Sequence, residues 1–299
     1  MTETIAYIRN SLKDIYPPGE AQALVRLIME RVCGLSTHQL LLGKGKELSD
    51  TEKFKIKEIV EGLRLYKPIQ YLLGIADFYG MEFKVTPDGL IPRPETEELV
   101  EMVLKKIPDH PVRILDMGTG SGVIGVTLAL ELKERAGEVV LADISPQALD
   151  LALENAMRLG ARVSTIQTNL FANIPQEKTD PHAEDADSAP DGGKGENGRN
   201  MLFDVIVANL PYIAEGEKLA PEVMKDPHTA LFGGPKGWEI IERFLARARD
   251  YLNEDGFVAL EIGYDQASVV TQIMDGYGYN YIEVLKDMSG VSRFPFGYR

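Results

Sequence analysis

The sequence predicts an α/β protein in which a mostly parallel, helix-covered sheet follows a small all-α domain. Two patterns predict this architecture. From about residue 92 onward, apolar segments typical of buried strands alternate with segments of helical periodicity. Before about residue 76, apolar residues instead recur three and four positions apart, and no strand pattern is present. We therefore expect helices on both faces of a sheet built from the second part of the chain.

Residues 1–76 are predicted to form a helical bundle. The N-terminal segment IAYIRNSLKDI and the later segment ALVRLIMERV each place their apolar residues on one helical face. Ser49 and Glu52 have the spacing of a capping box, which indicates the start of a helix that runs to about Tyr66. Pro68 ends this helix, and PIQYLLG adds one short turn.

Residues 77–91 are predicted to connect the two domains. The segment FYGMEFKV carries aromatic and apolar residues on both sides of Gly80, which is typical of a β-hairpin. Pro87, Asp88 and Gly89 then supply turn residues.

Residues 92–299 are predicted to form the second domain. Pro94 and Pro146 suit the first turn of a helix. Residues 172–200 interrupt the pattern, because they are rich in Pro, Gly, Asp and Glu, and we expect a disordered surface insertion there. The strands are expected at 112–117, 138–144, 162–169, 203–209 and 256–263, and further helices at 121–135, 146–159 and 238–252.

The composition argues against several classes of protein. The 299 residues carry a net charge of −14, which is unfavourable for general binding to nucleic acid. Cys33 is the single cysteine, so an intrachain disulfide is impossible, and we expect it to be a buried packing residue. The four histidines show no metal-ligand spacing, so no metal is expected. No signal peptide or membrane span is recognisable, and we expect a cytoplasmic protein that makes no membrane contact.

The segment LDMGTGSG, from Leu115 to Gly122, joins a predicted strand to a predicted helix. Glycines in such a turn let the backbone approach a ligand closely. Nicotinamide dinucleotides bind similar loops, but their fingerprint needs glycine at the position of Val123. With Asp116 in front, the segment instead resembles motif I of class I methyltransferases, which implies S-adenosyl-L-methionine as cofactor. A purely structural glycine turn remains the alternative.

Asp143 closes the next predicted strand, where its carboxylate can accept hydrogen bonds from both ribose hydroxyls. The alternative is a helix cap, because Asp143 and Ser145 both precede Pro146. In the methyltransferase fold, Asn169 and Leu170 at the end of the third strand would lie beside the adenine. The predicted cofactor contacts are Asp116, Gly118, Thr119, Gly120, Ser121, Gly122, Asp143, Ile144, Asn169, Leu170 and Asn209.

Asn209, Leu210, Pro211 and Tyr212 follow the fourth predicted strand. They resemble the (Asn/Asp/Ser)-Pro-Pro-(Tyr/Phe) motif of methyltransferases that act on planar NH2 groups. The nitrogen of such a group is a weak nucleophile and must be oriented. The Asn209 side-chain oxygen and the Leu210 carbonyl can each accept one N–H, and Tyr212 can stack on the planar group. We therefore assign these four residues to catalysis and to substrate binding; a simple turn is the alternative.

Several longer segments together resemble the HemK/PrmC family of peptide chain release factor glutamine N5-methyltransferases. They are PIQYLLGIADFYGMEFKV, LIPRPETEELV, KDPHTALFGG, LEIGYDQ and KDMSGVSRFPFGYR. The resemblance implies a Rossmann-like class I methyltransferase fold with a mostly parallel seven-stranded sheet. The long 172–200 segment is not typical of the family.

The resemblance implies methylation of the glutamine in the Gly-Gly-Gln motif of class 1 peptide chain release factors. The helical domain would help to dock that partner, and we expect a monomer with no direct contact to nucleic acid. Because Leu210 replaces the first proline of the motif, an N6-adenine methyltransferase acting on rRNA or DNA stays open as an alternative. So does a binding domain that retains the fold without activity.

Overall fold

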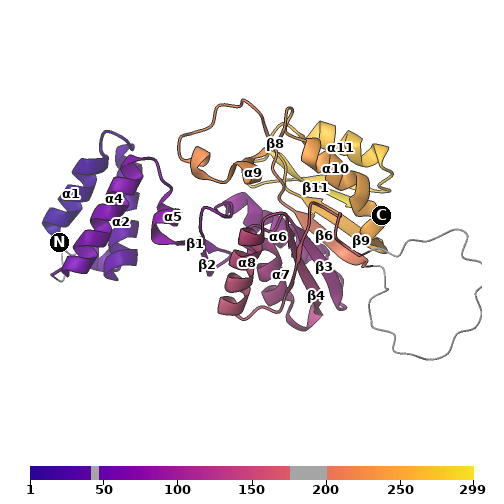
Figure 1. Cartoon of the computed structure of the whole chain (residues 1–299), viewed down its shortest axis with the longest axis horizontal. Helices are drawn as coiled ribbons and strands as arrows, with labels where there is room; N and C mark the ends of the chain where they lie inside the picture. The colour runs from indigo at the N-terminus through magenta and orange to yellow at the C-terminus, as the bar shows by residue number, and fades with distance from the viewer. Residues whose placement is uncertain (42–46, 176–200) are drawn as a thin grey trace, which may run out of the picture.

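The computed structural model describes residues 1–41, 47–175 and 201–299. Its N-terminal part is a bundle of helices (Figure 1). Their apolar faces pack around the fully buried Ile8 and Ile28. Cys33 is buried in the same core, as predicted. The helices are α1 (Thr2–Leu12), α2 (Pro18–Cys33), α3 (Thr37–Leu41), α4 (Asp50–Arg64) and α5 (Ile69–Leu73).

Helix α4 begins with the predicted capping box. The Ser49 hydroxyl accepts the backbone N–H of Glu52 at 3.2 Å, and the Glu52 carboxylate accepts the N–H of Ser49 at 2.8 Å. Both bonds satisfy backbone donors that a helix start leaves without intrahelical partners. The helix ends at Arg64, and α5 forms the short turn expected after Pro68, with Gly74 in the left-handed conformation behind it.

The predicted hairpin follows directly. Strand β1 (Ile75–Phe78) pairs antiparallel with β2 (Met81–Lys84). The two residues between them, Tyr79 and Gly80, have φ of 50° and 72°. Two consecutive positive φ values are typical of a type I′ turn, whose twist matches that of the flanking strands.

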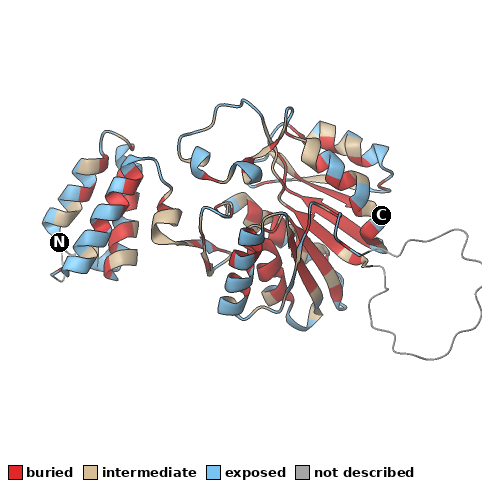
Figure 2. Cartoon of the chain, in the orientation of Figure 1, coloured by how far each residue is buried: buried red, intermediate tan, exposed pale blue. Residues whose placement is uncertain are grey.

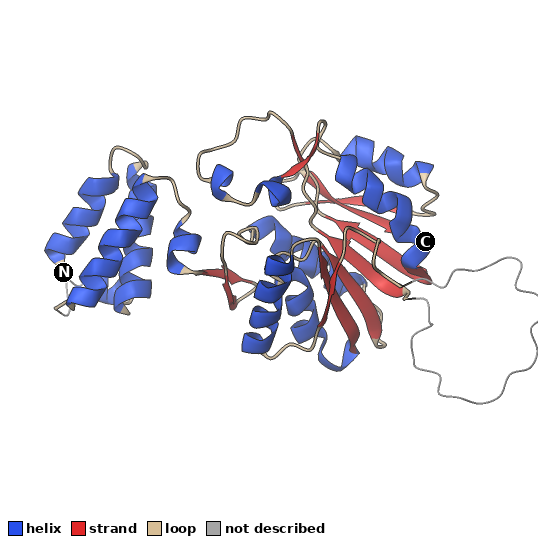
Figure 3. Cartoon of the chain, viewed as in Figure 1, coloured by secondary structure: helices blue, strands red, loops and turns tan. Residues whose placement is uncertain are grey.

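Among the described residues after the hairpin, the main sheet (Figure 3) has seven strands. Their order is β10-β11-β9-β6-β3-β4-β5, and only the pairs formed by β11 are antiparallel. The predicted α/β fold class is thereby confirmed. Its elements are α6 (Pro94–Lys106), β3 (Val112–Met117), α7 (Val123–Leu132), η1 (Lys133–Arg135), β4 (Ala136–Asp143), α8 (Pro146–Leu159), β5 (Ser164–Gln167), β6 (Phe203–Ala208), β7 (Ile213–Ala214), η2 (Val223–Lys225), α9 (His228–Leu231), β8 (Phe232–Gly234), α10 (Glu239–Ala248), η3 (Arg249–Tyr251), β9 (Leu252–Leu260), α11 (Ala267–Gly276), β10 (Ile282–Lys286) and β11 (Ser292–Tyr298).

Two apolar layers sandwich the sheet, and its central strands are buried on both faces (Figure 2). Helices α6, α7 and α8 pack on one face, and α10 and α11 pack on the other. Successive residues of β3 point to opposite faces of the sheet: Ile114 belongs to the first apolar layer and Leu115 to the second. Burial on both faces explains the nearly continuous apolar character of these strands.

The strand order reverses between β3 and β6. From β3 the chain moves outward to β4 and β5, then returns to the other side of β3 to form β6 and β9. In open α/β sheets, ligands bind at the carboxyl ends of the strands beside this switch point. The loops that follow β3 and β6 here contain the glycine motif and Asn209.

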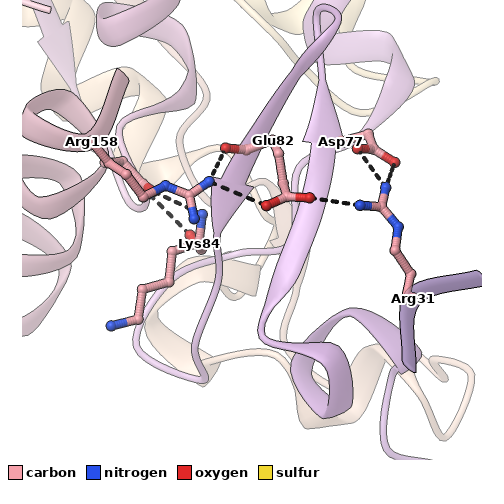
Figure 4. Close-up of polar contacts among 6 residues, drawn as sticks. Arg31, Asp77, Glu82, Lys84 and Arg158 are labelled. Atoms are coloured by element: carbon pink, nitrogen blue, oxygen red, sulfur yellow. Dashed lines mark hydrogen bonds and ion pairs between the residues drawn. The ribbon is translucent and has the colours of Figure 1, made fainter. Parts of the chain in front are cut away.

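A chain of ion pairs connects the helical bundle to the sheet domain through the hairpin (Figure 4). Arg31 of α2 pairs with Asp77 of β1 at 2.7 Å and with Glu82 of β2 at 2.6 Å. Arg158 of α8 approaches the same Glu82 carboxylate at 3.5 Å, and Lys84 of β2 pairs with Glu154 of α8. The hairpin therefore forms ion pairs with both the helical bundle and the sheet domain.

The predicted disordered insertion falls largely outside the described residues, because residues 176–200 are not among them. The flanking residues are described and meet each other. The backbone N–H of Met201 donates to the carbonyl of Pro175 at 3.2 Å. The chain therefore leaves and re-enters the domain at one point.

Candidate functional site

A cavity of about 350 Å³ lies at the carboxyl ends of β3, β4, β5 and β6. This volume is within the usual range for small-molecule sites, roughly 300–1,000 Å³. Most of the predicted cofactor residues line it, namely Gly118, Thr119, Gly120, Ser121, Asp143, Ile144, Asn169, Leu170 and Asn209. The structure thus brings together side chains that lie almost a hundred residues apart in sequence.

The glycine loop has the backbone that its sequence predicts. Gly118, Gly120 and Gly122 all have positive φ, of 73°, 55° and 85°. A side chain at any of these positions would be strained. Because Gly122 occupies the left-handed N-cap position, α7 starts at Val123, two residues later than the sequence pattern indicated. Gly122 itself packs against Ala152 and lies behind the cavity wall.

Asp116, a predicted cofactor contact, supports the glycine loop from behind. Its carboxylate is fully buried and does not line the cavity. Oδ2 accepts the Thr119 hydroxyl at 2.6 Å and the backbone N–H of Gly125 at 2.8 Å. Burial raises the pKa of Asp116 to about 6, although these two bonds act in the opposite direction. Asp116 therefore fixes the shape of the glycine loop.

Asp143 faces the cavity and also binds the loop. Its Oδ2 accepts the backbone N–H of Gly120 at 2.9 Å, and its Oδ1 accepts that of Ser145 at 2.9 Å. The cap of α8 is the Ser145 hydroxyl, which accepts the N–H of Ala148. Ser145, not Asp143, is therefore the cap of α8, and the Asp143 carboxylate faces the cavity, where it can accept hydrogen bonds from hydroxyl groups.

Leu170 has a φ of 52°, which is uncommon for a residue with a side chain. The Thr168 hydroxyl holds this conformation by donating to the Leu170 carbonyl at 2.7 Å. The side-chain oxygen of the neighbouring Asn169 accepts a hydrogen bond from Arg243 of α10 at 3.3 Å. Both predicted residues line the cavity, and Arg243 is a wall residue that the sequence analysis missed.

The loop after β6 closes the cavity on the opposite side. Leu210 lies against the glycine loop so closely that a Cβ at Gly118 would come within 3.0 Å of its Cδ2. The Tyr212 carbonyl accepts a hydrogen bond of 2.8 Å from Gln266, which anchors the end of the loop. Leu210 and Pro211 line the cavity, whereas Tyr212 faces a second one.

The second cavity has a volume of about 240 Å³ and shares Asn209 with the first. Tyr212 and the buried Glu261 lie in its wall. Burial and the nearby Glu261 carboxylate raise the pKa of Tyr212 to about 12, so its hydroxyl stays protonated. Charged residues from two other segments complete the wall, namely Arg93 and Glu95 at the start of α6 and Arg293 of β11.

Three parts of the cavity walls were not predicted from the sequence, namely Glu261, Thr96 and the segment from Pro227 to Ala230. A signal existed for Glu261, because an acidic residue follows the apolar run GFVAL directly. Thr96 lies in the segment LIPRPETEELV, whose sequence shows the family resemblance but does not mark Thr96 as a site residue.

A further cluster joins the cavity rim to the helical bundle. The buried Asp226 accepts the Tyr71 hydroxyl of α5 at 2.6 Å and pairs with Arg93 at 2.6 Å. The Tyr71 hydroxyl also lies 3.0 Å from the carbonyl of Gly89, a residue of the first cavity wall. The position of α5 is thus coupled to the loop that precedes the Pro227–Ala230 segment.

The larger cavity fits S-adenosyl-L-methionine. Backbone of the glycine loop lies at the cavity wall, where a side chain would be strained, as a close approach to the methionine part requires. The Asp143 carboxylate offers an acceptor for hydroxyls, and Ile144 and Leu170 offer apolar surface for a flat base. Ile144 is 56% exposed although it is apolar, which suits a residue that covers a ligand.

Family models match both parts of the chain. The "PrmC N-terminal domain" model matches residues 3–74, and the "Methyltransferase small domain" model matches residues 94–181. The match of the first model ends where the hairpin begins. Within the described parts of the chain, none of the helices is long and apolar enough to cross a membrane.

Three curated proteins named release factor glutamine methyltransferase are similar over nearly their whole length. The one from Neisseria gonorrhoeae is 34% identical and covers 91% of each chain. The one from Bacteroides thetaiotaomicron is 34% identical and covers 98% of each chain. The one from Streptococcus pneumoniae is 33% identical and covers 95% of this chain and 94% of its own.

Proposed function

Because this chain belongs to the family of release factor glutamine methyltransferases, we propose that it methylates the side-chain amide nitrogen of the glutamine in the Gly-Gly-Gln motif of class 1 release factors. The observation that carries this proposal is the position of Asn209. It lies at the meeting point of the two cavities, one fitted to the cofactor and the other lined by Tyr212.

The first cavity holds the methyl donor. When bound, S-adenosyl-L-methionine supplies an electrophilic methyl group on a positively charged sulfur. Asp143 and the glycine loop fix the donor's position, and Leu210 closes the wall beside Gly118. These residues would hold the donor beside Asn209, which lines both cavities.

The acceptor amide enters through the second cavity and reaches Asn209, where the two cavities meet. The lone pair of an amide nitrogen is delocalised, so alignment of the nitrogen is the main contribution that the protein can make. The Asn209 side-chain oxygen and the Leu210 carbonyl accept the two N–H groups of the substrate. These bonds strengthen as positive charge develops on the nitrogen, which makes them more favourable in the transition state than in the ground state.

Tyr212 provides the flat wall of the acceptor site. Its hydroxyl stays protonated because its pKa is raised to about 12. No proton transfer from Tyr212 is needed, and its ring stacks on the planar amide. The four predicted residues Asn209, Leu210, Pro211 and Tyr212 thus act as one unit that orients a single NH2 group.

The helical bundle contributes to docking of the release factor. Tyr71 and Asp226 support this role, because they connect α5 to the rim of the cavity. The net charge of −14 agrees with a protein partner and disfavours direct nucleic-acid contact. Transfer of a labelled methyl group to a purified release factor tests the proposed function; label on the factor is expected, and its absence would contradict it.

A further inference from the structure

Glu261 and Asn209 occupy equivalent places on neighbouring strands. Ala208, the last residue of β6, lies opposite Leu260, the last residue of β9, and the two strands are parallel. The next residue of each strand is therefore brought to the same edge of the sheet. The backbone N–H of Glu261 donates to the Ala208 carbonyl at 3.1 Å, and the Glu261 residue is only 2% exposed.

Thr96 of α6 connects the two side chains. Its hydroxyl donates to Oε2 of Glu261 at 2.6 Å. Its oxygen accepts a hydrogen bond from Nδ2 of Asn209 at 3.1 Å. A hydroxyl has one hydrogen, so after donating to Glu261 the Thr96 oxygen can only accept.

This arrangement determines which end of the Asn209 amide faces the substrate. The oxygen and nitrogen ends of an amide have nearly the same shape, so its hydrogen-bond partners decide its orientation. The NH2 end must face Thr96, and Oδ1 must therefore face the cavity. That is the orientation in which Asn209 can accept an N–H from a substrate.

We propose that Glu261 and Thr96 are positioning residues that hold Oδ1 of Asn209 toward the substrate amide. The inference rests on the proposed function, in which Asn209 accepts the substrate N–H. The donor and acceptor roles in this series of hydrogen bonds are set by Glu261, which accepts the Thr96 hydroxyl because its carboxylate is ionised. A protonated Glu261 could donate to Thr96 instead, which would free the Thr96 hydrogen for Oδ1 of Asn209. The amide would then present its NH2 end to the substrate NH2, and two donors cannot bond each other.

The orientation of the Asn209 amide therefore depends on whether Glu261 is ionised. Burial raises the pKa of Glu261 to about 7, whereas the hydrogen bonds from Thr96 and Asn209 and the charge of Arg293 lower it. Glu95 of α6 raises it further. Tyr212 faces the same group from the loop after β6, and Arg293 of β11 is itself paired with Asp287 at 2.9 Å. The acceptor orientation of Asn209 is thus expected to fail as the pH falls below neutral.

Two substitutions of similar size at Thr96 separate this role from simple packing. Thr96→Val removes the hydroxyl and keeps the shape, and Thr96→Ser keeps the hydroxyl. We expect Thr96→Val to lower kcat for a release factor on the order of 10- to 100-fold, by comparison with removal of an oriented transition-state hydrogen bond. Thr96→Ser should stay within about threefold, and cofactor Kd should change little in both variants.

The pH profile supplies a signature that packing would not produce. Wild-type kcat should rise with an apparent pKa near that of Glu261, about 7, whereas Glu261→Gln should be slower and independent of pH over this range. Equal losses in Thr96→Val and Thr96→Ser, or a Thr96→Val enzyme with wild-type kcat and pH profile, would overturn the proposal.

A measurement without turnover separates this inference from the proposed function. NMR signals of the Asn209 side-chain NH2, identified by their loss in Asn209→Asp, should shift with the titration of Glu261 in the wild type and in Thr96→Ser. The shift should be absent in Glu261→Gln, and in Thr96→Val it should be clearly smaller than in Thr96→Ser, because only the direct contact between Asn209 and Glu261 remains. An unresponsive wild-type signal refutes the positioning role, even if the enzyme is active. A responsive signal in a protein that methylates no release factor supports the positioning role and refutes the proposed function.

Discussion

The carboxylate of Asp143, at the end of β4, accepts a hydrogen bond of 2.9 Å from the backbone N–H of Gly120 in the loop after β3. One side chain therefore both shapes the glycine loop and faces the cavity. Its second oxygen accepts the N–H of Ser145 at the start of α8. The two loops that would enclose the cofactor are held together by this residue.

Replacement of Asp143 by alanine should weaken binding of S-adenosyl-L-methionine by tenfold or more, because hydrogen bonds to charged groups contribute about 1.5–3 kcal/mol. Isothermal titration calorimetry measures the effect directly. Asp150→Ala, which removes an exposed carboxylate from α8, is the matched control and should bind normally. Unchanged affinity in Asp143→Ala would limit this residue to a structural role.

Replacement of Asn209 by alanine should lower kcat at least 100-fold while changing cofactor Kd by less than about threefold. The reason is that Asn209 orients the acceptor nitrogen, whereas Asp143 and the glycine loop hold the donor. Single-turnover methyl transfer and calorimetry separate the two effects. Asn280→Ala, at an exposed position outside both cavities, is the control. Turnover near the wild-type rate in Asn209→Ala would refute the amide-holding role.

Deletion of residues 178–198 should leave activity and Tm nearly unchanged. Met201 and Pro175, on either side of the deleted segment, already form a backbone hydrogen bond of 3.2 Å, so a short connection can replace the segment. The entropy of closing a loop also depends only weakly on its length. A thermal melt and an activity assay of the deletion variant decide the point. A large loss of either property would show that the segment has a role of its own.

Glu261→Gln should stabilise the protein more at high pH than at low pH. The folded state raises the pKa of Glu261 from 4.5 to about 7, so it binds more protons than the unfolded state between these values. Below pH 4.5 the protonated Glu261 costs the folded state nothing, and this contribution to the free energy of unfolding is lost as the pH rises through 7. Removing the charge should therefore stabilise by roughly 2 kcal/mol more at pH 8.5 than at pH 5.5.

Denaturant unfolding at the two pH values measures this difference. Glu254→Gln, an exposed substitution on β9, the strand that directly precedes Glu261, provides the control and should have little effect at either pH. A Glu261→Gln effect that is equal at both values would contradict the raised pKa.

Much of the fold was predictable because its signals are local. The capping box at Ser49, the hairpin at Gly80 and the helix start at Pro146 each depend on a few neighbouring residues. The same holds for the glycine loop and for Asn209, whose motifs are contiguous. These features were recognisable without knowledge of how the strands pair.

The missed residues depend on register and on the packing of distant elements. Glu261 meets Asn209 only because Ala208 lies opposite Leu260, and no local pattern specifies that register. Thr96 joins them from a helix more than a hundred residues earlier in the chain. Asp116 is recognisable from its motif, but the contacts of its buried carboxylate with Thr119 and Gly125 become visible only in the folded chain.

The most direct test of the central claim is methyl transfer from labelled S-adenosyl-L-methionine to a purified class 1 release factor. A second factor, with the glutamine of its Gly-Gly-Gln motif replaced by alanine, serves as the control. Label on the first factor and none on the second is the predicted result, and it would identify the glutamine amide as the group that Asn209 holds. No label on either factor, with label on ribosomal RNA instead, would contradict the account and identify an adenine amino group as the acceptor.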